Sequence, residues 1–167
     1  YPLRRQRQMC IRDSYNGNIA ETYWKTSSDS HLRGYGYAYD NLNRLKSSFY
    51  HKNGLSTGCY DESLSYDMNG NIQSLLRFGN SDGQNMALKI DELAYTYHPD
   101  KKNQLLKVFD SSNHFLGFDD DSPDGIADND DDYDYDANGN MIKDQNKGIT
   151  SISYNHLNLP VLSLIHI

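Results

Sequence analysis

A repeated Tyr-Asp motif constrains the fold of this chain more than any other feature. It reads Tyr-Asp, two free positions, Gly or Asn, Asn or Arg, and then an aliphatic residue. Clear copies occupy residues 135–141 and 66–72, and a looser copy occupies residues 39–45. Asp bonds its side chain to nearby backbone and opens turns, and Asn-Gly reaches the positive φ that a tight type I′ hairpin requires. Each copy therefore predicts a β-hairpin that begins after the tyrosine.

Weaker copies extend the motif along the chain. Residues 97–105 hold a longer turn, residues 154–159 hold a degenerate copy, and residues 16–19 match the end of the motif without its Tyr-Asp. The tyrosines at 39, 66, 97, 135 and 154 lie 27, 31, 38 and 19 residues apart. Repeats at this scale indicate a stacked repeat architecture. About a dozen short strands joined by polar turns predict an all-β chain of tandem antiparallel β-hairpins that form an open curved sheet.

Three local expectations can be compared directly with a structure. Residues 86–93 carry apolar side chains at helical spacing, so a short helix is an alternative to a strand there. Residues 114–118 are predicted as a strand that follows residues 105–109 around a turn at 111–113. Gly139 is expected at positive φ, and valine is expected to be tolerated better at Gly148 than at Gly139.

Residues 35–45 and 133–141 resemble the YD repeats of RHS proteins, in the form common in Bacteroidetes-like sequences. The resemblance covers roughly residues 15–161. It implies a segment of an RHS β-shell, in which the repeats wind into a hollow wall around a C-terminal toxin or other variable domain. It also implies that such a protein is secreted or displayed at the cell surface. The expected partners are neighbouring RHS repeats and an encapsulated C-terminal domain of the same full-length chain.

A second class of function stays open at this stage. Aromatic faces stack on sugar rings, so the repeated tyrosines also suit a cell-surface adhesin or a carbohydrate-binding repeat module, with a glycan as partner. The competing interpretation is that the rings form packing ladders between adjacent strands. An exposed row of rings on one sheet face would favour glycan binding.

Both ends of the sequence resemble translated adaptor DNA. Residues 162–167 read as CTG-TCT-CTT-ATA-CAC-ATC, and residues 9–14 read as the complementary strand in a shifted frame. Residues 4–8 match the longer arm of the same transposase-based sequencing adaptor. We therefore interpret residues 1–14 and 162–167 as adaptor-derived artefacts, leave them out of the fold prediction, and treat 15–161 as the repeat region.

Charge argues against two classes of partner. Without those ends, the chain holds 12 basic and 22 acidic residues, and ten aspartates fall within residues 119–136. Nucleic-acid binding needs clustered Lys and Arg, so no nucleic-acid partner is expected. Apolar runs stay far below the ~20 residues of a membrane span, so no membrane span is expected.

The sequence shows no catalytic constellation. It lacks a His-Glu-x-x-His pair and a glycine loop for phosphate. The histidines at 31, 51, 98, 114 and 156 stand apart and are expected at the surface. Cys59 is the one cysteine outside the adaptor-like ends, and we expect an inert, partly buried thiol. We therefore predict no enzyme activity, no catalytic residue and no cofactor-binding residue.

The acidic insertion at 119–132 contains one pattern with ligand spacing. Residues 120–131 match the calcium loop D-x-D/N/S-x-D-G-x-x-D-x-x-D/E and resemble thrombospondin type-3 and dockerin loops. Glycine at the sixth position permits the bend. The alternative is a solvated insertion without a ligand. The predicted calcium ligands are Asp120, Ser122, Asp124, Ile126 through its backbone carbonyl, Asp128 and Asp131.

Overall fold

The chain folds into antiparallel β-strands. The computed structural model describes residues 17–79, 86–120 and 130–165, and it contains no helix within them. The all-β prediction is confirmed. The strands are β1 (Glu21–Lys25), β2 (Leu32–Tyr39), β3 (Leu45–Lys52), β4 (Leu55–Ser56), β5 (Glu62–Tyr66), β6 (Ile72–Gly79), β7 (Leu88–Tyr97), β8 (Leu105–Asp110), β9 (Tyr133–Tyr135), β10 (Met141–Asp144), β11 (Ile149–Tyr154) and β12 (Pro160–Ile165).

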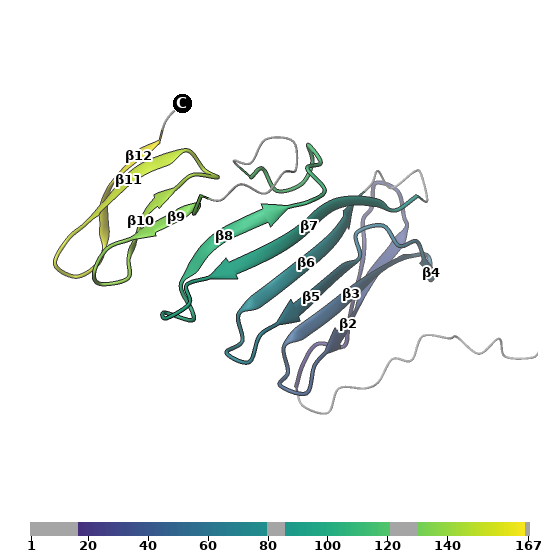
Figure 1. The fold of residues 1–167 in the computed structure, drawn as a ribbon. Coiled ribbons are helices and arrows are strands. Elements are labelled where there is room, and N and C mark those ends of the chain that lie inside the picture. The colour runs from purple at the N-terminus through teal and green to yellow at the C-terminus, as the bar shows by residue number, and fades with distance from the viewer. Residues whose placement is uncertain (1–16, 80–85, 121–129, 166–167) are drawn as a thin grey trace, which may run out of the picture.

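The strands pair in two sheets. The larger has the order β1-β2-β3-β5-β6-β7-β8, with β4 beside β3, and the smaller has the order β12-β11-β10-β9. Every strand pair is antiparallel. Figure 1 shows the sheets following one another, with the hairpin turns of the motif aligned along one edge. The prediction of one open curved sheet is therefore correct only for the open, antiparallel arrangement, because regular pairing stops between β8 and β9.

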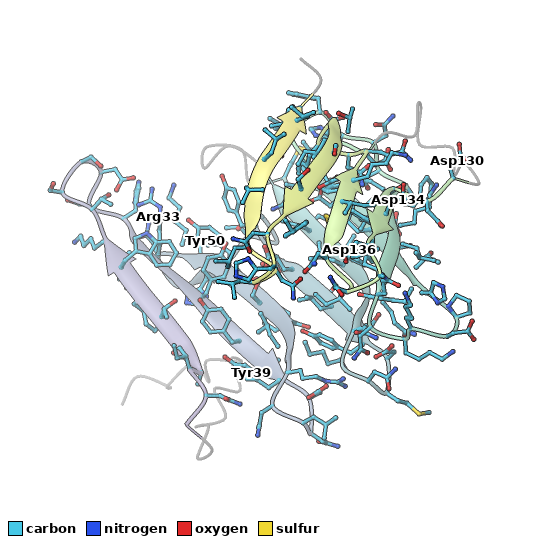
Figure 2. The ribbon with its side chains drawn as sticks, turned by 90° about the vertical axis from the view of Figure 1, so that its left-hand side faces the viewer. Arg33, Tyr39, Tyr50, Asp130, Asp134 and Asp136 are labelled. Carbon is cyan, nitrogen blue, oxygen red and sulfur yellow. The ribbon has the colours of Figure 1, made fainter. Side chains whose placement is uncertain are left out.

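The hydrophobic core is small and is formed by side chains on one face of the sheets. Leu93 on β7, Val108 on β8 and Tyr133 on β9 are buried together, where the two sheets meet. Leu75, Tyr95, Leu105, Phe118, Tyr135 and Met141 pack around them. Within the described residues no second layer covers either sheet, so most inward side chains are only half-buried, by their neighbours along the same face. Figure 2 shows the side chains of both sheets, with the smaller sheet in front of the larger in this view.

The helix alternative for residues 86–93 is wrong. Residues 88–97 form β7, in which Asp91 and Leu93 are buried while Glu92 and Ala94 are exposed. This period of two places alternate side chains on opposite faces, as a strand requires. Pairing with β6 and β8 on both sides overrides the local helical spacing.

The predicted strand at 114–118 is also wrong. Those residues form turns, in which the Gly117 amide donates to the His114 carbonyl at 2.7 Å. The Phe118 amide then donates to Asp91 Oδ1 at 2.5 Å. A Cβ added at Gly117 would overlap the carbonyl of Ile90. Glycine thus allows this segment to cross the end of β7 at close range.

The last strand extends past residue 161, where the predicted repeat region ends. β12 runs from Pro160 to Ile165, and pairs such as Ser153↔Leu162 and Ile152↔Ser163 join it to β11. Residues 162–165, which were left out of the fold prediction, therefore extend the smaller sheet. All six residues of β12 are exposed. The adaptor origin of residues 162–167 stays a prediction.

Candidate functional site

The aspartate of each motif organises its turn. Asp136 Oδ1 accepts hydrogen bonds from the backbone amides of Asn138 and Asn140, both at 2.9 Å. Its Oδ2 accepts the Asn140 side-chain amide at 2.9 Å. Asp67 and Asp40 accept the equivalent backbone amides in their own turns. In the degenerate last copy, Asn155 Oδ1 accepts the amides of Leu157 and Leu159.

The turn type differs from the prediction. The Gly139 amide donates to the Asp136 carbonyl at 3.0 Å, and the Asp136 amide donates to the Asn140 carbonyl at 2.9 Å. Gly139 has φ +85°, as predicted, whereas Asn138 is not at positive φ. A type I′ turn needs positive φ at two successive residues, so the type I′ assignment is wrong. The pattern is a type I turn followed by one left-handed residue, and Gly70, Asn43 and Asn158 occupy the same position.

A β-bulge follows every one of these turns. Tyr66 pairs with Ile72 while Ser65 pairs with Ser74, so Gln73 is an extra residue between them. Such a bulge twists the strand and re-aims the neighbouring side chain. The other extra residues are Lys46, Leu106, Ile142 and Val161.

The repeated tyrosines connect each hairpin to the one before it. In every case the tyrosine hydroxyl donates to the backbone carbonyl of the aliphatic residue of the preceding motif. Their rings are half-buried, so the packing interpretation describes these five residues. The bonds are Tyr39 to Ile19 (2.9 Å), Tyr66 to Leu45 (2.6 Å), Tyr97 to Ile72 (2.9 Å), Tyr135 to Leu105 (2.8 Å) and Tyr154 to Met141 (2.7 Å).

The Asn or Arg of the motif adds a second connection between turns. Arg44 binds Asp40 in its own turn at 2.6 Å, reaches the Asp67 carbonyl at 3.0 Å, and lies 4.5 Å from the centre of the Tyr66 ring. Three asparagines make equivalent contacts with the next turn. These are Asn18 to Asn43 (3.3 Å), Asn71 to Lys102 (2.9 Å) and Asn140 to Asn158 (3.0 Å).

These contacts shift the acidities of the motif residues. Hydrogen bonds from Asn140 hold the pKa of Asp136 below its usual range. Backbone and side-chain bonds from Arg44 lower the pKa of Asp40. Burial would raise the pKa of Asp67, but the bonds from Asn71 and Asn69 outweigh it, and the net direction is down. Burial raises the pKa of Tyr66, Tyr97 and Tyr135, since a phenolate would lose its hydration.

Buried aspartates stabilise the edge opposite the turns. Asp132 accepts the Val108 amide at 2.7 Å, and Asp110 accepts the Glu92 amide at 2.9 Å. Asp91 receives Arg77 Nε as well as the Phe118 amide. Asp91, Asp110 and Asp132 are at most 1% exposed. Sequence reasoning missed them, because charged residues are rarely fully buried and these three aspartates lie outside the Tyr-Asp motif.

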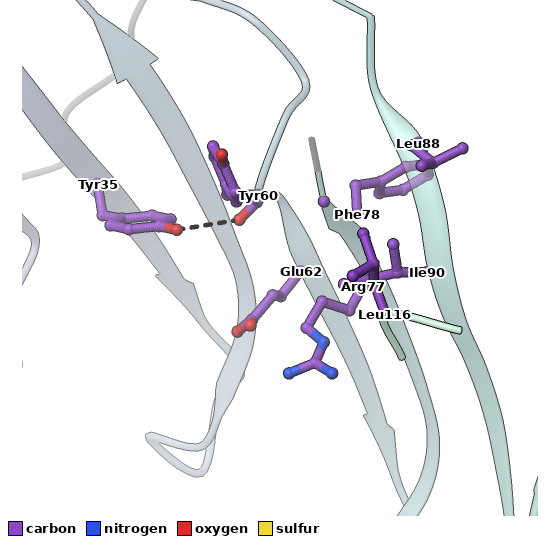
Figure 3. A pocket seen from close by; sticks show the side chains of 9 residues that line it. Tyr35, Tyr60, Glu62, Arg77, Phe78, Leu88, Ile90 and Leu116 are labelled. Carbon is purple, nitrogen blue, oxygen red and sulfur yellow. Dashed lines mark hydrogen bonds between the residues drawn. The ribbon is translucent and has the colours of Figure 1, made fainter. Parts of the chain in front are cut away.

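One hollow opens on the larger sheet between β2 and the start of β7 (Figure 3). Its volume is about 640 Å³, within the range of ligand pockets. Figure 3 shows the Tyr35 hydroxyl donating to the Tyr60 carbonyl, at 3.3 Å, on one side of it. Burial, followed by the charge of Glu62, raises the pKa of Tyr35 to about 12. The lining residues are Tyr35, Tyr60, Glu62, Arg77, Phe78, Gly79, Leu88, Ile90 and Leu116.

The predicted calcium ligands lie largely outside the described residues, namely Ser122, Asp124, Ile126 and Asp128. Of the remaining two, Asp120 Oδ2 accepts the Asp110 amide at 2.7 Å, and Asp131 is exposed. No group of three or more His, Cys, Asp or Glu that could hold a metal occurs in the described part of the chain. The calcium loop stays a prediction.

Histidine placement departs from expectation at one position. His51 is 3% exposed, beneath Tyr23, whose ring centre lies 5.3 Å away. A Cβ at Gly34 would come within 2.6 Å of His51 Nε2, so the glycine admits the imidazole. His98 and His114 accept backbone amides in their own turns. Cys59 is a free thiol and is more fully buried than expected, at 4% exposed.

Comparison with known proteins assigns no family. No protein-family model matches the sequence, and no curated protein matches it significantly. Within the described ranges no helix is long and apolar enough to cross a membrane.

Proposed function

We propose that this chain is a structural segment of an RHS-repeat shell, which encapsulates or displays a C-terminal toxin or variable domain. The observation that supports this function is the series of five tyrosine hydroxyls, each bonded to the preceding hairpin. Contacts of this kind connect nearest neighbours in one direction, as in a solenoid. Such a series can continue at either end with further hairpins.

The single-layer sheet supports the same proposal. A hairpin that buries its side chains only against lateral neighbours needs another hairpin on each side. At the two ends, β1 and β12 leave large apolar side chains exposed, including Trp24 at 39% and Val161 at 64%. Neighbouring RHS repeats would cover these edges, and the protein would be secreted or held at the cell surface.

Limited proteolysis of a longer gene product tests the shell. The chain would be expressed with its flanking repeats and C-terminal domain, next to the C-terminal domain alone. We expect the enclosed domain to resist a protease that digests the isolated domain. Equal digestion rates would contradict encapsulation.

The adhesin or carbohydrate-binding alternative makes a different prediction. It needs exposed ring faces in a row, whereas the five motif tyrosines are half-buried and committed to carbonyls. A glycan array separates the two functions: specific retention of this chain on one glycan class would favour the adhesin.

A further inference from the structure

The hollow on the larger sheet has two chemically different ends. Glu62 on β5 and Arg77 on β6 are cross-strand partners and lie side by side at one end (Figure 3). Phe78, Leu88, Ile90 and Leu116 form an apolar wall at the other end. Leu88 is 41% and Leu116 58% exposed. An apolar ligand group that covered them would be favoured by the removal of that surface from water.

The aromatic rings nearby do not offer a platform for a sugar. Tyr35 lies between Trp24 and Tyr37, with ring centres 5.8 and 6.0 Å away and nearly parallel planes. Both faces of the Tyr35 ring are therefore covered. Tyr60 packs edge to face against Tyr50 at 5.2 Å. A pyranose ring or a cation that requires an open aromatic face has no such face at Tyr35.

Glu62 and Arg77 form no ion pair with each other in the described part of the chain, and Arg77 is oriented by a third residue. Arg77 Nε is bound to the fully buried Asp91, which fixes the guanidinium. A guanidinium has five N–H donors, so the four on its two Nη atoms can bind another carboxylate in bidentate fashion. Within residues 17–79, 86–120 and 130–165, no hydrogen bond or ion pair joins the Glu62 carboxylate to another group. Glu62 is thus available to a cationic ligand group.

Backbone strain accompanies this site. Tyr60 has φ +60°, and every other described residue at positive φ is Gly, Asn or Ser. A bulky residue in this region is a genuine outlier, and such outliers cluster at ligand sites and switches. The strained backbone brings the Tyr60 carbonyl within hydrogen-bonding distance of the Tyr35 hydroxyl. The two residues line the hollow together with Glu62.

We infer that this hollow binds a small zwitterion with an apolar body, namely a free apolar α-amino acid. The ligand ammonium group binds Glu62, the ligand carboxylate binds the Nη atoms of Arg77, and the ligand side chain covers Leu88, Ile90 and Leu116. One ligand molecule thus contacts the Glu62 carboxylate, the Arg77 guanidinium and the apolar wall at the same time. This inference is independent of the shell function, because the tyrosine series does not pass through the hollow.

Ligand-observed NMR and calorimetry on the full chain test the inference. L-phenylalanine is the probe, and a Kd of ~1 mM is expected for a ligand of this size. Phenethylamine lacks the carboxylate, 3-phenylpropionate lacks the ammonium group, and each should bind at least about tenfold more weakly. Because Arg77 also neutralises Asp91, phenethylamine tests the role of Arg77 without a variant that endangers folding.

The Glu62 contact is tested with a matched pair of variants. Glu62→Gln should weaken L-phenylalanine binding about tenfold or more and leave 3-phenylpropionate binding unchanged. Glu92→Gln removes an exposed carboxylate from the same sheet and should change neither. The inference is overturned if no binding occurs up to ~10 mM, if all three ligands bind equally, or if Glu62→Gln has no effect. Binding of methyl glucoside in place of L-phenylalanine would also overturn it.

Discussion

The Tyr135 hydroxyl donates a hydrogen bond of 2.8 Å to the carbonyl oxygen of Leu105, across the boundary between the two sheets. Regular strand pairing stops there, yet the bond from motif tyrosine to preceding aliphatic residue continues unchanged. The Asp132 amide donates to the Leu106 carbonyl at 2.8 Å and joins the residue before β9 to β8. The tyrosine contact is therefore a more regular feature of the repeat than the sheet ladder.

Tyr135→Phe tests that contact. The variant keeps the half-buried ring and deletes only the donor, so the free energy of unfolding should fall by about 1 kcal/mol. Tyr23→Phe is the matched control, because Tyr23 is 51% exposed and its hydroxyl bonds to Glu21 on the surface. The control should change stability by less than about 0.5 kcal/mol. Urea denaturation measures both, and equal losses would contradict the role of the tyrosine series.

Gly139→Val tests the turn geometry. Gly139 has φ +85°, where a β-branched side chain is strained, and the expected cost is about 1–3 kcal/mol. Gly148 cannot serve as the tolerant site, because it also has positive φ, at +62°. Ala137→Val is a better control, since Ala137 is exposed in the same turn and is not at positive φ. Chemical denaturation should show a small effect at 137, and equal costs would refute the turn assignment.

Asp132→Ala tests the edge opposite the turns. The substitution leaves the buried Val108 amide without its acceptor and removes one hydrogen bond of the Asn146 side chain, which also donates to the Tyr133 hydroxyl. The expected loss is about 1–3 kcal/mol. Hydrogen exchange should also become faster at the Val108 amide. Asp134→Ala is the control, because Asp134 is exposed and its single ion pair, with Lys143, is long at 3.9 Å. A similar loss of stability in this variant would contradict the proposed role of burial.

The sequence predicted the parts of the fold that depend on local chemistry. The Asp and Gly of each motif determine a turn within a few residues, so the hairpins and the positive φ of Gly139 could be predicted. The bulges and the tyrosine contacts depend on a strand from another repeat. The prediction of a strand at 114–118 was wrong because the conformation of that segment also depends on a distant strand. Gly117 packs directly against the backbone of Ile90 on β7.

The hollow and the buried aspartates could not have been found by pattern. Glu62 and Arg77 are 15 positions apart and become partners only through the register of β5 and β6. Asp132 belongs to a run of acidic residues whose other members Asp131 and Asp134 are exposed. Composition alone cannot tell which aspartate of such a run is buried, because pairing across strands decides it.

Because the turn aspartates have lowered pKa values, we expect the protein to lose stability in acid. The pKa of Asp136 is lower in the folded state than in the unfolded state. Its contribution to the free energy of unfolding is therefore fully present above the unfolded-state pKa of about 3.9, and it is lost as the pH falls through the lower folded-state pKa. Asp136→Asn keeps an oxygen for the two turn amides, as Asn155 does naturally. Urea midpoints measured between pH 7 and pH 2 should therefore show a shallower acid loss in the variant. An identical pH profile would contradict the assignment.

The acidic insertion concentrates negative charge in a short stretch of the chain. Ten aspartates fall within residues 119–136, and two charges ~6 Å apart in water repel by about 0.7 kcal/mol before screening by salt. Asp120, Asp132 and Asp136 offset part of this by accepting backbone amides. Lys107 donates to the Asp130 carbonyl at 3.0 Å. The remaining negative charge favours a bound cation.

Titration calorimetry with calcium decides between a metal loop and a solvated insertion. We expect binding with a Kd of ~10⁻⁴–10⁻³ M, because Ser122 adds no charge and Asp131 is a shorter final ligand than Glu. Asp124→Ala should abolish the heat, whereas Asp134→Ala, which makes the same charge change outside the loop pattern, should keep it. Millimolar calcium should also raise the melting temperature of the wild type by mass action. No heat from the wild type, or equal heat from wild type and Asp124→Ala, would leave the segment as a solvated insertion.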